Sequence, residues 1–105
     1  MELLEKRVYY IELLHLYGEL LSPTQKEILE DYLDCDLSLS EIANNRSISR
    51  AAVDDAIKKG MKKLDAFEEA LKLIDKNDKI MKNIAVLKEK FGNCDEIEQI
   101  EEVLK

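Results

Sequence analysis

SLSEIANNRSISRAAVDDAIKK, residues 38–59, has the clearest structural pattern in this 105-residue chain. It opens with Ser38 and Glu41, which have the spacing of a capping box, a reciprocal pair that satisfies two N–H groups at the start of a helix. An apolar helical face follows at Leu39, Ile42 and Ala43. The stretch therefore predicts a short helix that begins at about residue 38.

The second half of the stretch predicts a turn and another helix. Asn44 to Ser47 interrupt the apolar pattern, and asparagine tolerates the left-handed backbone that a turn needs. Ile48 is expected to plug the turn, and Ser49 is a second N-cap candidate. The helical period then restarts at Val53, Ala56 and Ile57. Two capped helices joined by a tight turn are the helix-turn-helix motif, which we place at about residues 38–59.

The same residues resemble region four of bacterial sigma factors, in which a T-L-x-E-I-A-x-x-x-x-V-S-R-x-x-V phrase forms the helix-turn-helix. The positions that match are Ser38, Leu39, Glu41, Ile42, Ala43, Ile48, Ser49, Arg50 and Val53. Ser47 stands where this pattern frequently has glycine, so the sequence leaves the angle of the turn open.

A closer resemblance covers roughly residues 8–75. The Tyr- and Leu-rich opening segment and the phrase LSPTQKEILEDYLDCDLSLSEIA are similar to the YlxM-like family. These are small bacterial proteins that are commonly encoded beside the signal recognition particle GTPase. The resemblance implies a helix-turn-helix protein with a link to that GTPase.

The composition favours a single all-α domain over residues 1–105. Hydrophobic residues make up 46% and charged residues 37% of the chain, with three glycines and one proline. The net charge of −7 disfavours nucleic-acid binding, because contacts to phosphates dominate the affinity of proteins for nucleic acids. The charge is uneven, however: residues 1–37 carry −6, residues 38–60 carry +1 and residues 61–105 carry −2. A positive face on an acidic body is the pattern that this distribution predicts.

Two helices are predicted before the central stretch. Residues 2–20 have apolar side chains around most of the helix, which indicates burial on two sides, by later helices or by a second subunit. Ser22, Pro23 and Gln25 have the order of an N-cap, a first helical residue and an S-x-x-Q box, so a second helix should run to about Leu33.

A long helix is predicted after the turn, with an a/d seam of three heptads. The seam comprises Val53, Ile57, Gly60, Leu64, Phe67, Leu71 and Ile74. It is either a self-associating zipper or the face that packs on the first helix. A break is expected at Asp75 to Asp78, followed by C-terminal helices over about residues 77–105. The overall expectation is a helical bundle of six helices without a sheet.

A homodimer is expected from the apolar excess of the first and fourth helices. Its interface should draw on Leu4, Val8, Ile11, Phe67, Leu71 and Ile74. The sequence leaves open which of the two apolar seams is used.

DNA contacts are expected from the second helix of the motif, which enters the major groove in such proteins. The residues that should form this face are Arg46, Ser49, Arg50, Ala51, Asp54, Lys58 and Lys62. Arg50 can take guanine O6 and N7 or a phosphate. Asp54 and Asp55 oppose phosphate binding, and both have a lysine four residues later, which favours ion pairs within the helix.

Two functions therefore stay open: a DNA-binding regulator, and a protein-interaction module that modulates the signal recognition particle GTPase. No enzyme is expected, because no nucleophile, metal set or phosphate loop joins the many carboxylates. Cys35, Cys94 and His15 have no zinc spacing, Asp34 and Asp36 lack the rest of an EF-hand loop, and no cofactor motif is present. No apolar run is long enough to span a membrane, so a cytosolic protein is expected.

Overall fold

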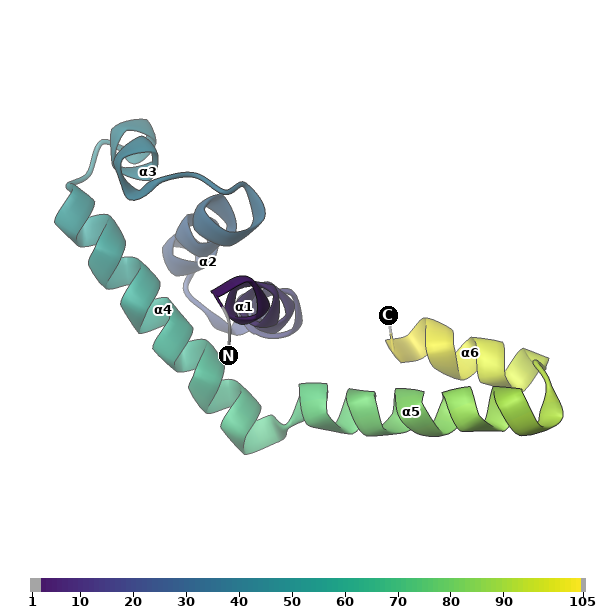
Figure 1. Ribbon diagram of the computed structural model, residues 1–105. Helices are drawn as coiled ribbons and strands as arrows, with labels where there is room; N and C mark the ends of the chain where they lie inside the picture. The colour runs from purple at the N-terminus through teal and green to yellow at the C-terminus, as the bar shows by residue number, and fades with distance from the viewer. Residues whose placement is uncertain (1–2, 105) are drawn as a thin grey trace. The chain divides into compact units, whose positions relative to one another are not determined.

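The computed structural model describes residues 3–104 and contains six α-helices with no strand in that range. The prediction of an all-α fold is confirmed (Figure 1). The helices are α1 (Leu3–Tyr17), α2 (Pro23–Leu29), α3 (Leu39–Arg46), α4 (Arg50–Leu71), α5 (Leu73–Phe91) and α6 (Asp95–Leu104). The chain divides into two compact units, residues 1–71 and residues 72–105. No helix of the described range has the length and apolar character needed to cross a bilayer.

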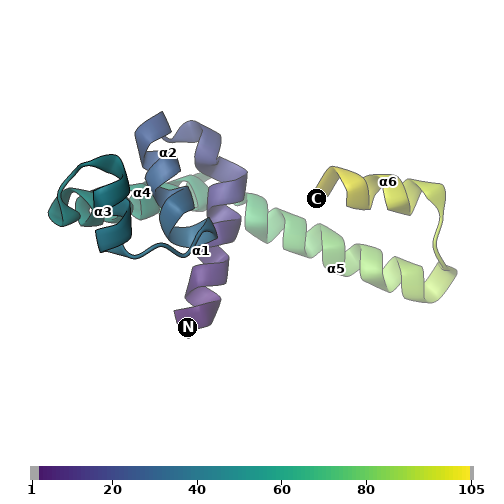
Figure 2. The same ribbon diagram turned by 90° about the horizontal axis from the view of Figure 1, so that it is seen from above.

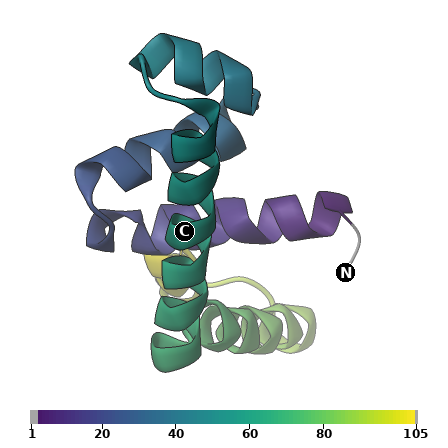
Figure 3. The same cartoon turned by 90° about the vertical axis from the view of Figure 1, so that its left-hand side faces the viewer.

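Unit 1, residues 1–71, is organised around α4. Helices α1, α2 and α3 each contact α4, and Figure 3 shows α1 crossing it. The buried side chains come from all four helices and their connections: Leu13, Leu14, Tyr17, Leu21, Ile28, Leu29, Leu33, Ile42, Ala43, Val53, Ile57 and Leu64. The first part of the predicted seam on α4 is therefore the face that packs inside this unit.

The first two helices follow the sequence prediction with local changes. Helix α1 ends at Tyr17, and a 3₁₀ turn over Gly18–Leu20 continues the expected segment. Its expected first residue, Glu2, lies outside the described residues. Ser22 Oγ accepts from the N–H of Gln25 at 3.3 Å, but the Gln25 side chain accepts from Lys63 Nζ at 3.1 Å. Helix α2 then widens into a π-helical turn over Glu30–Asp34.

The predicted end of the long helix is wrong. Helix α4 ends at Leu71, because Lys72 adopts the left-handed conformation (φ 55°, ψ 37°) and interrupts the helical hydrogen bonds. The carbonyl of Lys72 accepts the N–H of Lys76 at 2.9 Å, which is the first hydrogen bond of α5. Ile74 therefore belongs to α5 and not to the α4 seam, and no break occurs at Asp75 to Asp78.

Unit 2, residues 72–105, is a hairpin of α5 and α6, whose fold is visible in Figure 2. Helix α5 starts at Leu73 rather than near residue 77 as expected, and ends at Phe91, where Gly92 follows as the C-cap with a φ of 79°. The end at Gly92 agrees with the sequence, since glycine is the preferred residue for a positive φ after a helix. Lys88 Nζ pairs with Glu101 Oε1 at 2.6 Å across the hairpin.

Gly60 allows a close approach between α4 and α2. A Cβ atom at this position would lie 2.7 Å from Leu29 Cδ1 and 3.3 Å from Leu29 Cγ. Leu29 is fully buried, so its side chain has little room to move away. The glycine that weakens the helix by propensity is thus the residue that lets α2 pack directly on the α4 backbone.

We predict that Gly60→Ala lowers stability by about 1 kcal/mol, because overpacking by about 1–3 kcal/mol exceeds the ~1 kcal/mol gain in helix propensity. In a Leu29→Ala background the same change should instead raise stability by about 1 kcal/mol, because the truncated side chain removes the clash. Urea unfolding followed by circular dichroism gives both free energies. An equal effect of Gly60→Ala in both backgrounds would show that the two residues do not collide.

Candidate nucleic-acid interface

Helix α3 begins as the sequence predicts. Ser38 Oγ accepts from the Glu41 N–H at 3.1 Å, and Glu41 Oε1 accepts from the Ser38 N–H at 3.1 Å. This capping box is complete, and the hydrogen bonds from Ser38 lower the pKa of Glu41. Ile42 and Ala43 are buried in unit 1. The cap and the buried face together fix where α3 starts and which side faces α4.

The turn after α3 depends on Ser47, which adopts the left-handed conformation (φ 56°, ψ 42°). Its N–H donates to the Asn44 carbonyl at 3.4 Å, and the Ile48 N–H donates to the Ala43 carbonyl at 3.1 Å. This is the pattern of a Schellman motif, with serine at the position where glycine is usual. Ile48 is 39% exposed, so it plugs the turn only in part. The sequence did not decide the angle of this turn, and the structure forms the turn with serine in place of glycine.

Ser49 starts the second helix of the motif. Its Oγ accepts from the Ala52 N–H at 3.0 Å, and its carbonyl accepts from the Val53 N–H at 3.1 Å, which confirms the predicted N-cap. Val53 is fully buried, while Arg50 and Ala51 are exposed. The first turn of α4 thus presents an arginine, a small residue and the positive end of the helix dipole to solvent.

The aspartates on this helix are paired with lysines one turn later. Lys58 Nζ lies 2.8 Å from Asp54 Oδ2, and Lys59 Nζ lies 3.0 Å from Asp55 Oδ2. The hydrogen bond that Lys58 donates to Asp54 raises the pKa of Lys58. Both pairs were expected from the spacing, and such exposed pairs are weak enough for a phosphate to compete with them.

Arg46 has partners that its position in the sequence did not reveal. Its Nε donates to Asp31 Oδ2 at 2.8 Å, and its Nη1 donates to Glu27 Oε2 at 3.1 Å. Its side chain is 28% exposed, and the hydrogen bond to Asp31 raises the pKa of the guanidinium group. The guanidinium group therefore ties the end of α3 to α2 and its π-helical turn.

The remaining predicted residues lie as follows. Lys62 is exposed on α4, two turns beyond Asp54 and about three turns from Arg50. For the predicted dimer face, Leu4, Val8 and Leu71 are exposed and Ile11 and Phe67 are half-buried in unit 1, whereas Ile74 lies in unit 2. The Phe67 ring packs beside Tyr17 with centroids 6.0 Å apart, so it contributes to the core of unit 1.

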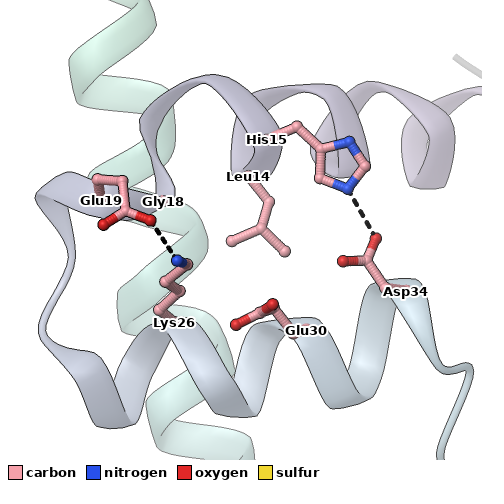
Figure 4. A pocket seen from close by; sticks show the side chains of 7 residues that line it. All are labelled: Leu14, His15, Gly18, Glu19, Lys26, Glu30 and Asp34. Carbon is pink, nitrogen blue, oxygen red and sulfur yellow. Dashed lines mark hydrogen bonds and ion pairs between the residues drawn. The ribbon is translucent and has the colours of Figure 1, made fainter.

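A pocket of about 260 Å³ lies between α1 and the α2 segment (Figure 4). His15 Nε2 lies 3.0 Å from Asp34 Oδ1, and Lys26 pairs with Glu19. The partners in these pairs lie 19 and 7 residues apart in the chain, so no short motif predicts them. No group of three His, Cys, Asp or Glu residues in the described range is arranged to hold a metal ion. The charges of this pocket mainly join the two helical segments.

Comparison with known proteins identifies relatives of the whole chain. The family model described as "Putative helix-turn-helix protein, YlxM / p13 like" matches residues 4–103. A UPF0122 protein of Fusobacterium nucleatum is 45% identical over 89 residues, which cover 85% of this chain and 86% of that protein. A UPF0122 protein of Clostridium acetobutylicum is 38% identical over 109 residues, covering 97% and 94%.

We predict that Arg46 and Arg50 have separable roles. Arg46→Ala should lower the free energy of unfolding by about 1–2 kcal/mol, because it removes two charge-assisted hydrogen bonds. Arg50→Ala should change it by less than about 0.5 kcal/mol, since Arg50 is exposed. Urea unfolding of both variants measures the difference. Equal stability of the two variants would contradict a structural role for Arg46.

Proposed function

The chain belongs to the YlxM/p13-like helix-turn-helix family, and from this we propose that it is a DNA-binding regulatory protein that inserts the start of α4 into the major groove. The observation that carries the proposal is that the first helical turn of α4 is exposed. It follows directly after the Ser47 turn and the Ser49 N-cap, both of which are completely formed. In this class of motif, the N-terminal residues of the second helix contact base edges. The motif is the feature that the family description and the local geometry have in common.

Each residue of this face has a distinct part in the proposal. Arg50 contacts a guanine edge or a phosphate, and Ala51 leaves room for a base to approach. Ser49 and the helix N-terminus hold one phosphate through backbone N–H groups. Lys58 and Lys62 follow the phosphate backbone along α4. Arg46 mainly stabilises the motif and does not contact DNA directly, because its guanidinium group is already bound to Asp31 and Glu27.

The charge of unit 1 limits how strong this binding is. Nine basic and fifteen acidic residues give residues 1–71 a net charge of −6. Phosphate binding must therefore come from a local cluster on α4, and the affinity should fall steeply with salt. The proposed protein is a DNA binder whose general affinity is low and whose base contacts decide where it binds.

A protein-interaction module linked to the signal recognition particle GTPase is the second candidate. The observation that favours a protein partner is the exposed apolar start of α1, where Leu3, Leu4 and Val8 are 85%, 71% and 57% exposed. Contiguous exposed apolar side chains are typical of protein interaction sites. The link to this GTPase comes from the family resemblance, and no contact geometry supports it. Failure to bind duplex DNA at low salt would favour this candidate.

The first test is loss of DNA binding when the cations of α4 are removed. Arg50→Ala combined with Lys58→Ala should weaken binding to random duplex DNA roughly tenfold and reduce the salt slope by about 2, since two cation contacts are lost. Fluorescence anisotropy at low and moderate salt gives both quantities. Lys79→Ala with Lys82→Ala removes the same charge from α5 and should leave the affinity within about twofold. An equal loss in both variants would contradict a site on α4.

The second test is a gain of affinity when the paired carboxylates are neutralised. Asp54→Asn with Asp55→Asn should raise affinity for duplex DNA by about fivefold or more, because it frees Lys58 and Lys59 and removes repulsion from phosphates. Glu69→Gln with Asp78→Asn, at two exposed carboxylates on the end of α4 and on α5, provides a charge-matched control. The same anisotropy titration at low salt measures the change. Unchanged or weaker binding in Asp54→Asn with Asp55→Asn would mean that this face does not meet phosphates.

A further inference from the structure

Unit 2 is too small to be stable as an isolated hairpin. It spans 34 residues, from Lys72 to Lys105, and chains below about 40 residues generally need a disulfide, a metal ion or another subunit to fold. Cys94, in the connection between its helices, is an exposed free thiol. Its apolar faces therefore need a cover beyond what α5 and α6 give each other.

The two helices of the hairpin each carry an apolar stripe, which has heptad spacing in α5. The stripe of α5 comprises Ile80, Ile84, Leu87 and Phe91, and that of α6 comprises Ile97, Ile100, Val103 and Leu104. Ile84 and Ile97 are buried, but Phe91 and Val103 remain 79% and 83% exposed. A stripe of this kind is normally covered by helices on two sides, as in a four-helix bundle.

The charges of the hairpin indicate which surface covers it. Five lysines and three acidic residues give α5 a net charge of +2, whereas α6 has five acidic residues and no basic residue. Lys88 and Glu101 already show this attraction within one hairpin, at 2.6 Å. Unit 1 carries a net charge of −6, so it offers no complementary net charge to α6, which carries −5. The helix that best complements α6 in charge and in apolar spacing is α5 of another copy.

We propose that two copies of this chain associate through their α5–α6 hairpins into an antiparallel four-helix bundle. In this arrangement α6 of each copy packs against α5 of the other, and the two-fold symmetry makes both contacts equivalent. Pairing of α6 with α6 is disfavoured, because it places the five negative charges of one helix against the five negative charges of the other.

A hollow in the hairpin fits this arrangement. It has a volume of about 410 Å³ and is lined mainly by Ile80, Ile100, Val103 and Leu104. Ile80 lies in the first half of α5 and the other three lie in the second half of α6, towards the opposite end of the hairpin from Phe91. In an antiparallel pair, the exposed Phe91 ring of one copy reaches the hollow of the other. The large, exposed ring thereby gains an apolar environment.

Sedimentation equilibrium of the full chain over a range of concentrations tests this proposal. The wild type should be a dimer, and Phe91→Lys with Val103→Lys should raise its dissociation constant by at least about tenfold. Both side chains are exposed in a single copy and lie near the C-terminal ends of their helices, where lysine favours the helix dipole. Any helix that the variant loses on dissociation should be limited to residues 72–105, because the separated hairpin lacks its cover while unit 1 keeps its own core; circular dichroism measures the amount.

The matched control is Leu3→Gln with Leu4→Gln, which removes two equally exposed apolar side chains from unit 1. This variant should remain a dimer with an unchanged dissociation constant. A wild type that is monomeric at all concentrations would overturn the proposal. So would a dimer that survives Phe91→Lys with Val103→Lys, or one that is lost only in the α1 variant.

Discussion

The close packing of α2 on α4 at Gly60 is the constraint on which unit 1 depends. Leu29 Cδ1 lies 2.7 Å from the position that a Cβ atom of residue 60 would take, so the two helices approach more closely than larger residues would allow. Helices α1 and α3 pack on the same α4, and the buried side chains of all four form one core. Because α4 is also the proposed DNA-contacting helix, the contact between α2 and α4 that stabilises the core also holds the proposed DNA-binding helix in place.

The basic residues of the motif and of the following turns of α4 divide into two groups by what they contact. Arg46 and Lys63 bind groups on the α2 segment, and Lys58 and Lys59 bind aspartates on α4 itself. Arg50 and Lys62 are exposed, and neither has an ion pair among residues 3–104. An acidic protein with few available cations cannot hold DNA by charge alone. The proposed function therefore depends on a few contacts at the start of α4 and not on a broad basic surface.

Local signals in the sequence predicted local structure well. Ser38 with Glu41, Ser22 and Ser49 cap the helices they were expected to cap, because a cap is made within three residues. The break at Lys72 was missed, since lysine has no preference for the left-handed conformation that ends α4 there. The ion pairs of Arg46 were missed as well, because Glu27 and Asp31 lie 19 and 15 residues away in the chain. Such partners are brought together by tertiary packing, which no short motif encodes.

A ¹H–¹⁵N correlation spectrum of the labelled chain, recorded as short duplex DNA is added, shows which residues contact the DNA. The proposed function predicts that amide shifts change first and most at residues 47–58, at the turn and the start of α4. Shifts in α5 and α6 should stay nearly constant. No change at low salt, or changes centred on α1 or on the hairpin, would contradict DNA recognition by this helix-turn-helix.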